Sequence, residues 1–185
     1  MNKKSFISVA ITLALICLVW IILTPIFFPN TQADAVGTAP HRGFYAPVFS
    51  LNTPQGEAHS LSSYQDRPVL IFFWASHCSI CKSVMPGLEA VYQDYAQQGF
   101  EILAINTTNQ DHLSAAEAYF QSQGYTFTML VDQDGSVSDQ YQIHAVPTSV
   151  IVNPDGKISD LIIGSGISEG FLRAHLDTLF TKGGQ

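Results

Sequence analysis

The sequence is poor in the residues that nucleic-acid-binding proteins and disulfide scaffolds need. Its 185 residues include only eight Lys and Arg against fifteen Asp and Glu, which gives a formal net charge of −7. Such an excess of acid removes the positive surface that binds phosphates, so no nucleic-acid partner is expected. Three cysteines are too few for a disulfide scaffold. The apolar content of 46% is instead sufficient for one packed domain with an appendage.

Charge is missing altogether from one stretch near the N-terminus. After Lys3 and Lys4, the residues from Phe6 to Phe28 are almost all apolar. A helix over this range is longer than the about 20 residues that cross a bilayer core, so we expect a cytoplasmic tail at residues 1–4 and a transmembrane anchor at residues 5–28. The alternative is a cleaved signal peptide, whose apolar region is usually only about 7–15 residues long.

The basic residues on either side of this run predict its orientation. Both N-terminal lysines precede it, and the first basic residue after it is Arg42, beyond Asp34. The positive-inside rule then places the N-terminus in the cytoplasm. We therefore expect a single-pass protein of the inner membrane, with a linker at residues 29–42 and an acidic domain at residues 43–185 in the periplasm or extracytoplasmic space.

Strand and helix patterns alternate through this domain. A continuous apolar run at residues 68–74 indicates a strand buried on both faces, and apolar residues at helical spacing indicate a helix from Ser79 to about Gln98. Before this strand, alternation at residues 46–51, a turn at 53–56 and the residues 58–61 indicate a hairpin, and after the α-helical spacing ends we expect a strand followed by a helix at residues 100–123. The later elements are expected to be a strand at 127–131, a short helix at 136–141, an antiparallel hairpin at 148–152 and 157–163, and a terminal helix at 168–181. This order predicts an α/β sandwich with parallel pairing.

Two cysteines stand at a position suited to redox chemistry. Cys78 and Cys81 are three residues apart, where the buried strand meets the following helix. Free N–H groups and the helix dipole favour a thiolate at Cys78, so we expect Cys78 to attack and Cys81 to resolve through a redox-active disulfide, with no cofactor and no metal. The alternatives are half of a zinc site or two structural thiols. The only other cysteine, Cys17, lies in the apolar run and offers zinc no second pair.

A second element precedes the last hairpin. Val146 and Pro147 stand directly before an expected strand. We expect a cis peptide bond between them, which would expose the Val146 backbone as an edge for a substrate chain to pair with. The alternative is an ordinary trans proline that ends a loop.

Several separated motifs resemble one known family. Trp74 leads into the Cys-x-x-Cys pair, Pro86 lies within the following helix, and the Val-Pro-Thr element and an Asn-Pro-Asp-Gly turn follow in order. Together they resemble the thioredoxin superfamily, and the anchor and the segment at residues 100–123 resemble its TlpA-like (ResA-type), membrane-tethered redoxin branch. The resemblance covers about residues 43–181. It implies a thioredoxin-like three-layer sandwich with an N-terminal β-hairpin and an inserted strand–helix segment, preceded by one transmembrane helix.

The resemblance also implies an activity. It predicts a membrane-anchored thiol:disulfide oxidoreductase that exchanges disulfides with extracytoplasmic protein substrates, as a reductant that receives electrons from a transmembrane reductase. A Cu(I)-binding metallochaperone that uses the same cysteines with a His is the alternative. A peroxidase fits less well, because Ala75 stands where that branch needs a Thr. The implied site residues are the catalytic Cys78 and Cys81 and the substrate-binding Trp74, Val146 and Pro147.

The sequence departs from the family at positions that handle protons. Thioredoxins bury an acid in the central strand, where this chain has Phe72, and many TlpA-like proteins place a Glu three residues after the second Cys, where it has Val84. His77, directly before the first Cys, replaces the usual Trp. A protonated His77 would favour the Cys78 thiolate, whereas the alternative is a side chain that only points into solvent. We therefore treat His77 as a possible modulator.

Overall fold

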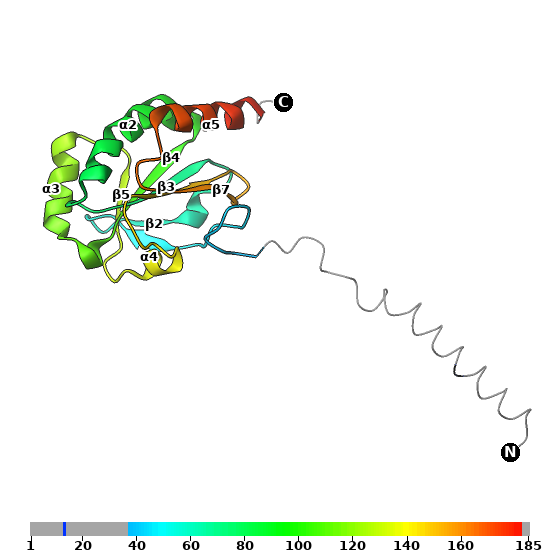
Figure 1. The fold of residues 1–185 in the computed structure, drawn as a ribbon, viewed down its shortest axis with the longest axis horizontal. Helices are drawn as coiled ribbons and strands as arrows, with labels where there is room; N and C mark the ends of the chain where they lie inside the picture. Colours follow the sequence, from blue (N-terminus) through cyan, green and yellow to red (C-terminus); the bar gives the residue numbers. More distant parts are fainter. Residues whose placement is uncertain (1–12, 14–36, 183–185) are drawn as a thin grey trace, which may run out of the picture. The chain divides into compact units, whose positions relative to one another are not determined.

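Within residues 37–182, seven strands form one mixed sheet in the order β2-β1-β5-β4-β3-β6-β7 (Figure 1). The structure is a computed structural model that describes residue 13 and residues 37–182. The three central strands are parallel, and both edges are completed by antiparallel hairpins, as expected. The strands are β1 (Ser50–Asn52), β2 (Ala58–Ser60), β3 (Val69–Trp74), β4 (Glu101–Asn106), β5 (Thr128–Val131), β6 (Thr148–Val152) and β7 (Ile158–Ile163).

Helices cover both faces of this sheet. Apolar residues of α2, α3 and α5 pack with one face, and those of α4 and the segment before β1 pack with the other. Figure 1 shows α2, α3 and α5 on the side of the sheet opposite to α4. The result is the expected α/β sandwich of three layers. The helices are α2 (Ser79–Tyr95), α3 (Leu113–Gln123), α4 (Ser136–Gln140) and α5 (Glu169–Lys182), with short 3₁₀ turns η1 (Leu61–Tyr64), η2 (Ala96–Gln98) and η3 (Thr108–Gln110).

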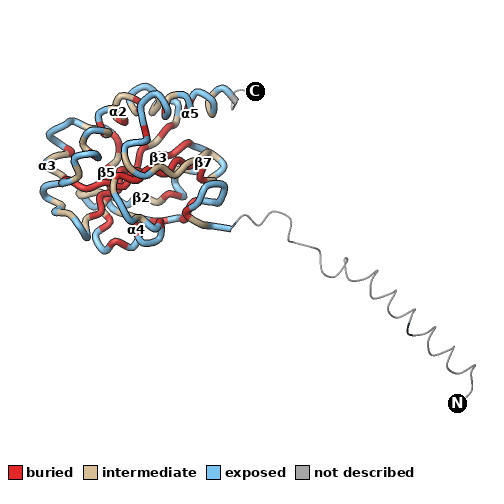
Figure 2. Tube along the Cα trace, viewed as in Figure 1, coloured by how far each residue is buried: buried red, intermediate tan, exposed pale blue. Residues whose placement is uncertain are grey.

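β3 lies in the middle of the core because all six of its residues are apolar. Every one of them is buried, and Figure 2 shows the buried segments concentrated in the sheet. Successive side chains of a strand point to opposite faces. Leu70, Phe72 and Trp74 accordingly join the cluster under α2, while Ile71 and Phe73 join the cluster under α4. The carboxyl end of β3 therefore delivers the chain into the Cys-x-x-Cys turn from a rigid support.

The segment before β1 differs from the sequence-based expectation. An alternating pattern suggested a strand from Ala46 onward, but β1 begins only at Ser50. Pro47 has no N–H to offer to a ladder. The preceding residues instead bond to the opposite edge of the sheet, at the turn between β6 and β7. The N–H of Ala46 donates to Gly156 O over 3.0 Å, and the N–H of Ile158 donates to Phe44 O over 2.9 Å.

The expected anchor lies almost entirely outside the described residues. Among the residues that the structure does describe, no helix is long and apolar enough to cross a membrane. The compact unit that holds the sheet begins at Gly37. Residues 37–42, expected to belong to the linker, therefore form part of this unit, and residues 29–36 lie outside the described range.

Candidate active site

The two cysteines occupy the first turn of α2. Cys78 is the N-cap residue, with extended backbone angles (φ −83°, ψ 106°), and its Sγ accepts a hydrogen bond from the N–H of Cys81 over 3.0 Å. A disulfide joins the two residues, whose Cα atoms are 5.3 Å apart. Cys78 is half-buried and Cys81 is fully buried. An incoming thiol can therefore reach Cys78 but not Cys81, which is the asymmetry that an attacking and a resolving thiol require.

The Val146–Pro147 element lies against the disulfide. The Val146–Pro147 peptide bond is cis, as expected. Val146 O lies 3.7 Å from Cys78 Sγ, although these residues are 68 positions apart in the chain. Thr148 Oγ1 donates to Ala145 O over 2.7 Å and ties the loop that precedes β6. The half-buried Val146 backbone thus borders the accessible sulfur.

Trp74 is placed differently from the expectation that it contacts substrate. Its side chain has no accessible surface, and its ring centroid lies 6.1 Å from the rings of Tyr119 and Phe120. The cause is the strand alternation that turns Trp74 toward the helices packed over β3. Its Nε1 has no hydrogen-bond partner among the described residues. Trp74 therefore supports the site from within the core and presents no surface to a substrate in this structure.

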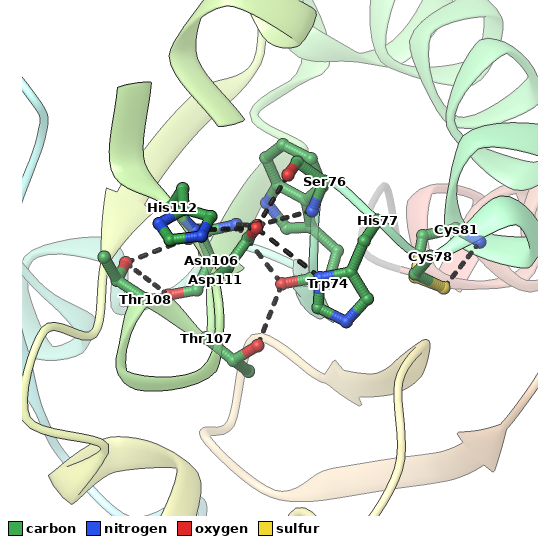
Figure 3. Close-up of polar contacts among 10 residues, drawn as sticks. All are labelled: Trp74, Ser76, His77, Cys78, Cys81, Asn106, Thr107, Thr108, Asp111 and His112. Carbon is green, nitrogen blue, oxygen red and sulfur yellow. Dashed lines mark hydrogen bonds and ion pairs between the residues drawn. A yellow bond between two sulfur atoms is a disulfide. The ribbon is translucent and has the colours of Figure 1, made fainter. Parts of the chain in front are cut away.

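The positions of the missing family acids are apolar in the structure as well. Phe72 is fully buried, and Val84 is half-buried against the cluster that contains Cys81. A carboxylate reaches the turn before Cys78 from a different part of the chain, the loop between η3 and α3. Asp111 receives two hydrogen bonds from Ser76, one from its N–H to Oδ2 over 2.5 Å and one from its Oγ to Oδ1 over 2.6 Å (Figure 3).

Asp111 is not among the site residues predicted from the sequence. One signal was present: Ser76 follows the carboxyl end of β3 and Asp111 follows the carboxyl end of β4. These strands are adjacent and parallel, so polar residues after their ends meet at one edge of the sheet.

The Asp111 carboxyl is permanently charged near neutral pH. Only 2% of its side chain is exposed, and burial by itself would raise its pKa. Hydrogen bonds from Asn106, from Ser76 and from the N–H of His112 outweigh burial and lower the pKa to about 2. A buried carboxylate with this many donors is a fixed anion.

This pKa predicts a pH-dependent contribution of Asp111 to stability. A carboxyl whose pKa falls from 3.8 to about 2 on folding stabilises the protein by about 2 kcal/mol above pH 4, and the contribution disappears as the pH falls through 2. We expect Asp111→Asn to lower the free energy of unfolding by at least this amount at pH 6, with the difference from the parent narrowing between pH 4 and pH 2. Urea titrations across pH measure it. Asp139→Asn, which changes an exposed carboxyl, serves as the control. A difference that stays constant down to pH 2 would contradict the assignment.

The histidines near the site differ in their surroundings. His77 is 66% exposed, yet its Nδ1 lies 3.5 Å from Asp111 Oδ1. His144, close to Val146 in the chain, is exposed. Across the described residues, no three His, Cys, Asp or Glu side chains are grouped so that they could hold a metal ion. The role of His77 as a modulator stays a prediction.

Known proteins share both the sequence and the fold. The AhpC/TSA family matches residues 43–161. The thiol-disulfide oxidoreductase ResA of Geobacillus kaustophilus is 31% identical over 178 residues, which cover 96% of this chain and 97% of that protein, and ResA of Bacillus subtilis is 27% identical over 96% and 94%. The crystal structure of StoA from Bacillus subtilis superimposes with a TM-score of 0.61 at 25% identity, over 69% of this chain and 95% of that one. With its Cys78–Cys81 disulfide on a thioredoxin-like sheet, the chain belongs to the AhpC/TSA family and is a thiol-disulfide oxidoreductase of the ResA type.

Proposed function

We propose that the protein is anchored in the inner membrane and uses Cys78 and Cys81 to reduce disulfides of extracytoplasmic protein substrates. The observation that supports this most directly is the pairing of a half-buried Cys78 at the N-terminus of α2 with a fully buried Cys81. The half-buried Val146 backbone beside Cys78 suits an extended protein segment better than a small molecule. The direction of exchange is inferred from the resemblance to TlpA-like reductants.

The proposed reaction has two exchange steps. The Cys78 thiolate attacks one sulfur of the substrate disulfide, so that a Cys78–substrate bond forms and the other substrate sulfur leaves as a thiolate. The Cys81 thiolate then attacks Cys78 Sγ, which forms the Cys78–Cys81 disulfide and releases the second substrate thiolate. The substrate gains two electrons and takes up two protons, and a transmembrane reductase is proposed to return two electrons to the protein.

The buried position of Cys81 sets a requirement on the second step. A thiol in apolar surroundings must lose a proton before it can attack, and Phe72 and Val84 offer no acceptor. We propose that solvent or the exposed His77 takes this proton while the mixed disulfide is still intact, once a movement of α2 admits it. If His77 is the acceptor, His77→Ala should slow resolution and leave formation of the mixed disulfide unchanged, and stopped-flow mixing with a disulfide substrate separates the two steps.

Two assays distinguish disulfide exchange from the alternative function as a Cu(I) carrier. Full-length protein is tested for dithiothreitol-dependent reduction of insulin and for competition with a Cu(I) chelator. We expect rapid insulin reduction that depends on Cys78, and Cu(I) binding too weak to compete. No contact in the described residues favours the Cu(I) alternative over disulfide exchange, and tight Cu(I) binding without insulin reduction would replace the proposed function with it.

The proposed topology predicts where the domain is found. Because residues 6–28 form an apolar run with basic residues only on its N-terminal side, we expect the full-length chain to fractionate with the membrane. Protease added from the periplasmic side should digest the domain, whereas protease confined to the cytoplasmic side should leave it intact. Recovery of a soluble chain that begins near Val36 would contradict the anchor and support a cleaved signal.

A further inference from the structure

We propose that Asp111 is a positioning residue for disulfide exchange: its carboxylate holds the turn that keeps Cys78 at the N-terminus of α2 when the disulfide is open. This role rests on the exchange reaction proposed above and adds a residue to it. Three features of the described structure support it: the bonds from Asp111 to the turn, the bonds that fix Asp111 itself, and the change in constraint when the disulfide is reduced.

In the turn before Cys78, the backbone N–H of Ser76 has the Asp111 carboxylate as its hydrogen-bond acceptor. The N–H of Cys78 donates to Ala75 O over 3.1 Å, which closes a turn around Ser76 and His77. Closing the turn leaves the N–H of Ser76 without a partner in it, and this N–H donates to Asp111 Oδ2. Ser76 Oγ donates to the other carboxylate oxygen. The two bonds together fix both the position and the rotation of the turn relative to the end of β4.

Asp111 is in turn held by two further donors. Asn106 Nδ2 donates to its Oδ2 over 2.9 Å, and the N–H of His112 donates to its Oδ1 over 2.8 Å (Figure 3). Asn106 is anchored by Thr108, whose Oγ1 donates to Asn106 Oδ1 over 2.9 Å. Each carboxylate oxygen therefore accepts two hydrogen bonds, one of them from the turn. Asp111 joins the end of β4 and the start of α3 to the turn that presents the nucleophile.

This connection becomes important when the disulfide is reduced. In the oxidised protein the covalent bond to Cys81 holds Cys78 Sγ in place. After reduction, the sulfur stays at the helix N-terminus only if the turn before it keeps its shape. The N–H of Cys81, 3.0 Å from the sulfur, then stabilises a thiolate. A loosened turn would let the sulfur move away and behave as an ordinary thiol.

The negative charge of Asp111 and its hydrogen bonds have opposite effects on the Cys78 thiolate. An anion near Cys78 disfavours the thiolate, so removal of the charge alone would make Cys78 more reactive at neutral pH. Other ionisable groups belong to the elements that meet at the turn: His77 on the turn itself, Lys82 on α2, His112 at the start of α3 and His144 before the cis-proline. A substitution that leaves these groups in place tests whether positioning or charge dominates, because the two predict shifts of opposite sign.

The Asp111→Asn substitution removes hydrogen-bond support for the turn as well as the negative charge. An amide has one acceptor oxygen, and its NH₂ group would face one of the two pairs of donors. If the NH₂ group takes the place of Oδ2, it faces the N–H of Ser76. If it takes the place of Oδ1, it faces the N–H of His112. Neither backbone group can turn away, so every orientation of the substituted amide leaves a backbone donor without its acceptor.

The test measures the reactivity of Cys78 in full-length protein with Cys81→Ser. Iodoacetamide alkylation of the Cys78 peptide is followed by mass spectrometry between pH 5 and pH 10, so that Cys17 does not contribute. We expect Asp111→Asn to move the midpoint of the pH profile upward by about one unit, which is an about tenfold lower rate at pH values well below the midpoint. Ser76→Ala, which removes one of the two bonds to the turn, should move it in the same direction by less.

Asp132→Asn is the matched control. Asp132 is another buried carboxylate that accepts backbone bonds, from Val137 and Ser138 of α4, so its loss costs stability without touching the turn. We expect its midpoint to equal that of the parent.

An unchanged or lowered midpoint in Asp111→Asn would overturn the positioning role, as would an upward shift in Asp132→Asn of the same size. If Asp111→Asn does not fold, an unchanged midpoint in Ser76→Ala would by itself overturn the positioning role of Asp111. The readout needs no substrate, so it remains valid if the parent fails to reduce insulin.

Discussion

Cys78→Ser is expected to abolish disulfide exchange, whereas Cys81→Ser is expected to accumulate mixed disulfides with substrate proteins. The half-buried Cys78 at the N-terminus of α2 is the sulfur that a substrate can reach, and Cys81 has no accessible surface. Removal of the nucleophile removes the first bond-forming step, so we expect insulin reduction to fall by at least about a thousandfold. With Cys81 absent, the first step still occurs but the intermediate cannot be resolved.

Non-reducing gels followed by mass spectrometry detect these intermediates. The expected result is a Cys81→Ser chain joined to substrate through Cys78, and no adduct with Cys78→Ser. Cys17→Ser provides the control, because the third cysteine lies far from the pair in the sequence and should leave both activity and trapping unchanged. Adducts that form through Cys81 in the Cys78→Ser variant would reverse the assigned roles.

The largest effect on stability is expected at Trp74. Its side chain is fully buried beneath the active-site turn and packs on Tyr119 and Phe120. Trp74→Ala removes this packing and leaves a cavity, so we expect the free energy of unfolding to fall by about 3–5 kcal/mol. That loss is a large part of the about 5–15 kcal/mol that stabilises an ordinary domain.

Trp74→Phe is the informative companion substitution. It keeps an aromatic ring in the core and removes Nε1, a buried donor that has no partner among the described residues. An unpaired buried donor costs about 1–3 kcal/mol, and its removal offsets part of the lost ring area. We therefore expect Trp74→Phe to cost less than half as much as Trp74→Ala in urea unfolding. If the two variants lose the same free energy of unfolding, the Trp74 Nε1 has a hydrogen-bond partner in solution. If Trp74→Phe folds normally yet loses substrate affinity, Trp74 contacts substrate after all.

Much of the fold follows from local patterns in the sequence. β3 is apolar at every position, and a strand of this kind is stable only between two packed faces, so its central place could be predicted. The apolar spacing after Ser79 likewise predicted α2, although the α-helix ends at Tyr95 and a 3₁₀ turn continues to Gln98. The start of β1 could not be predicted, because the partner of residues 44–46 is the distant turn at Gly156.

For the active site, the sequence by itself determined the Cys-x-x-Cys pair and its place at a strand–helix junction. These depend on residue types and short spacings, which are local properties. The cis proline beside the cysteines, which follows Val146, 68 positions from Cys78, was expected because the order of separated motifs resembles the thioredoxin superfamily. Only the tertiary structure decided that Trp74 faces the core and that Asp111 bonds to Ser76, 35 residues away. Both outcomes depend on the register between β3 and β4, which places Trp74 opposite Asn106 and brings the two loops beyond them together. Long-range pairing selects that register, and no periodicity within either segment specifies it.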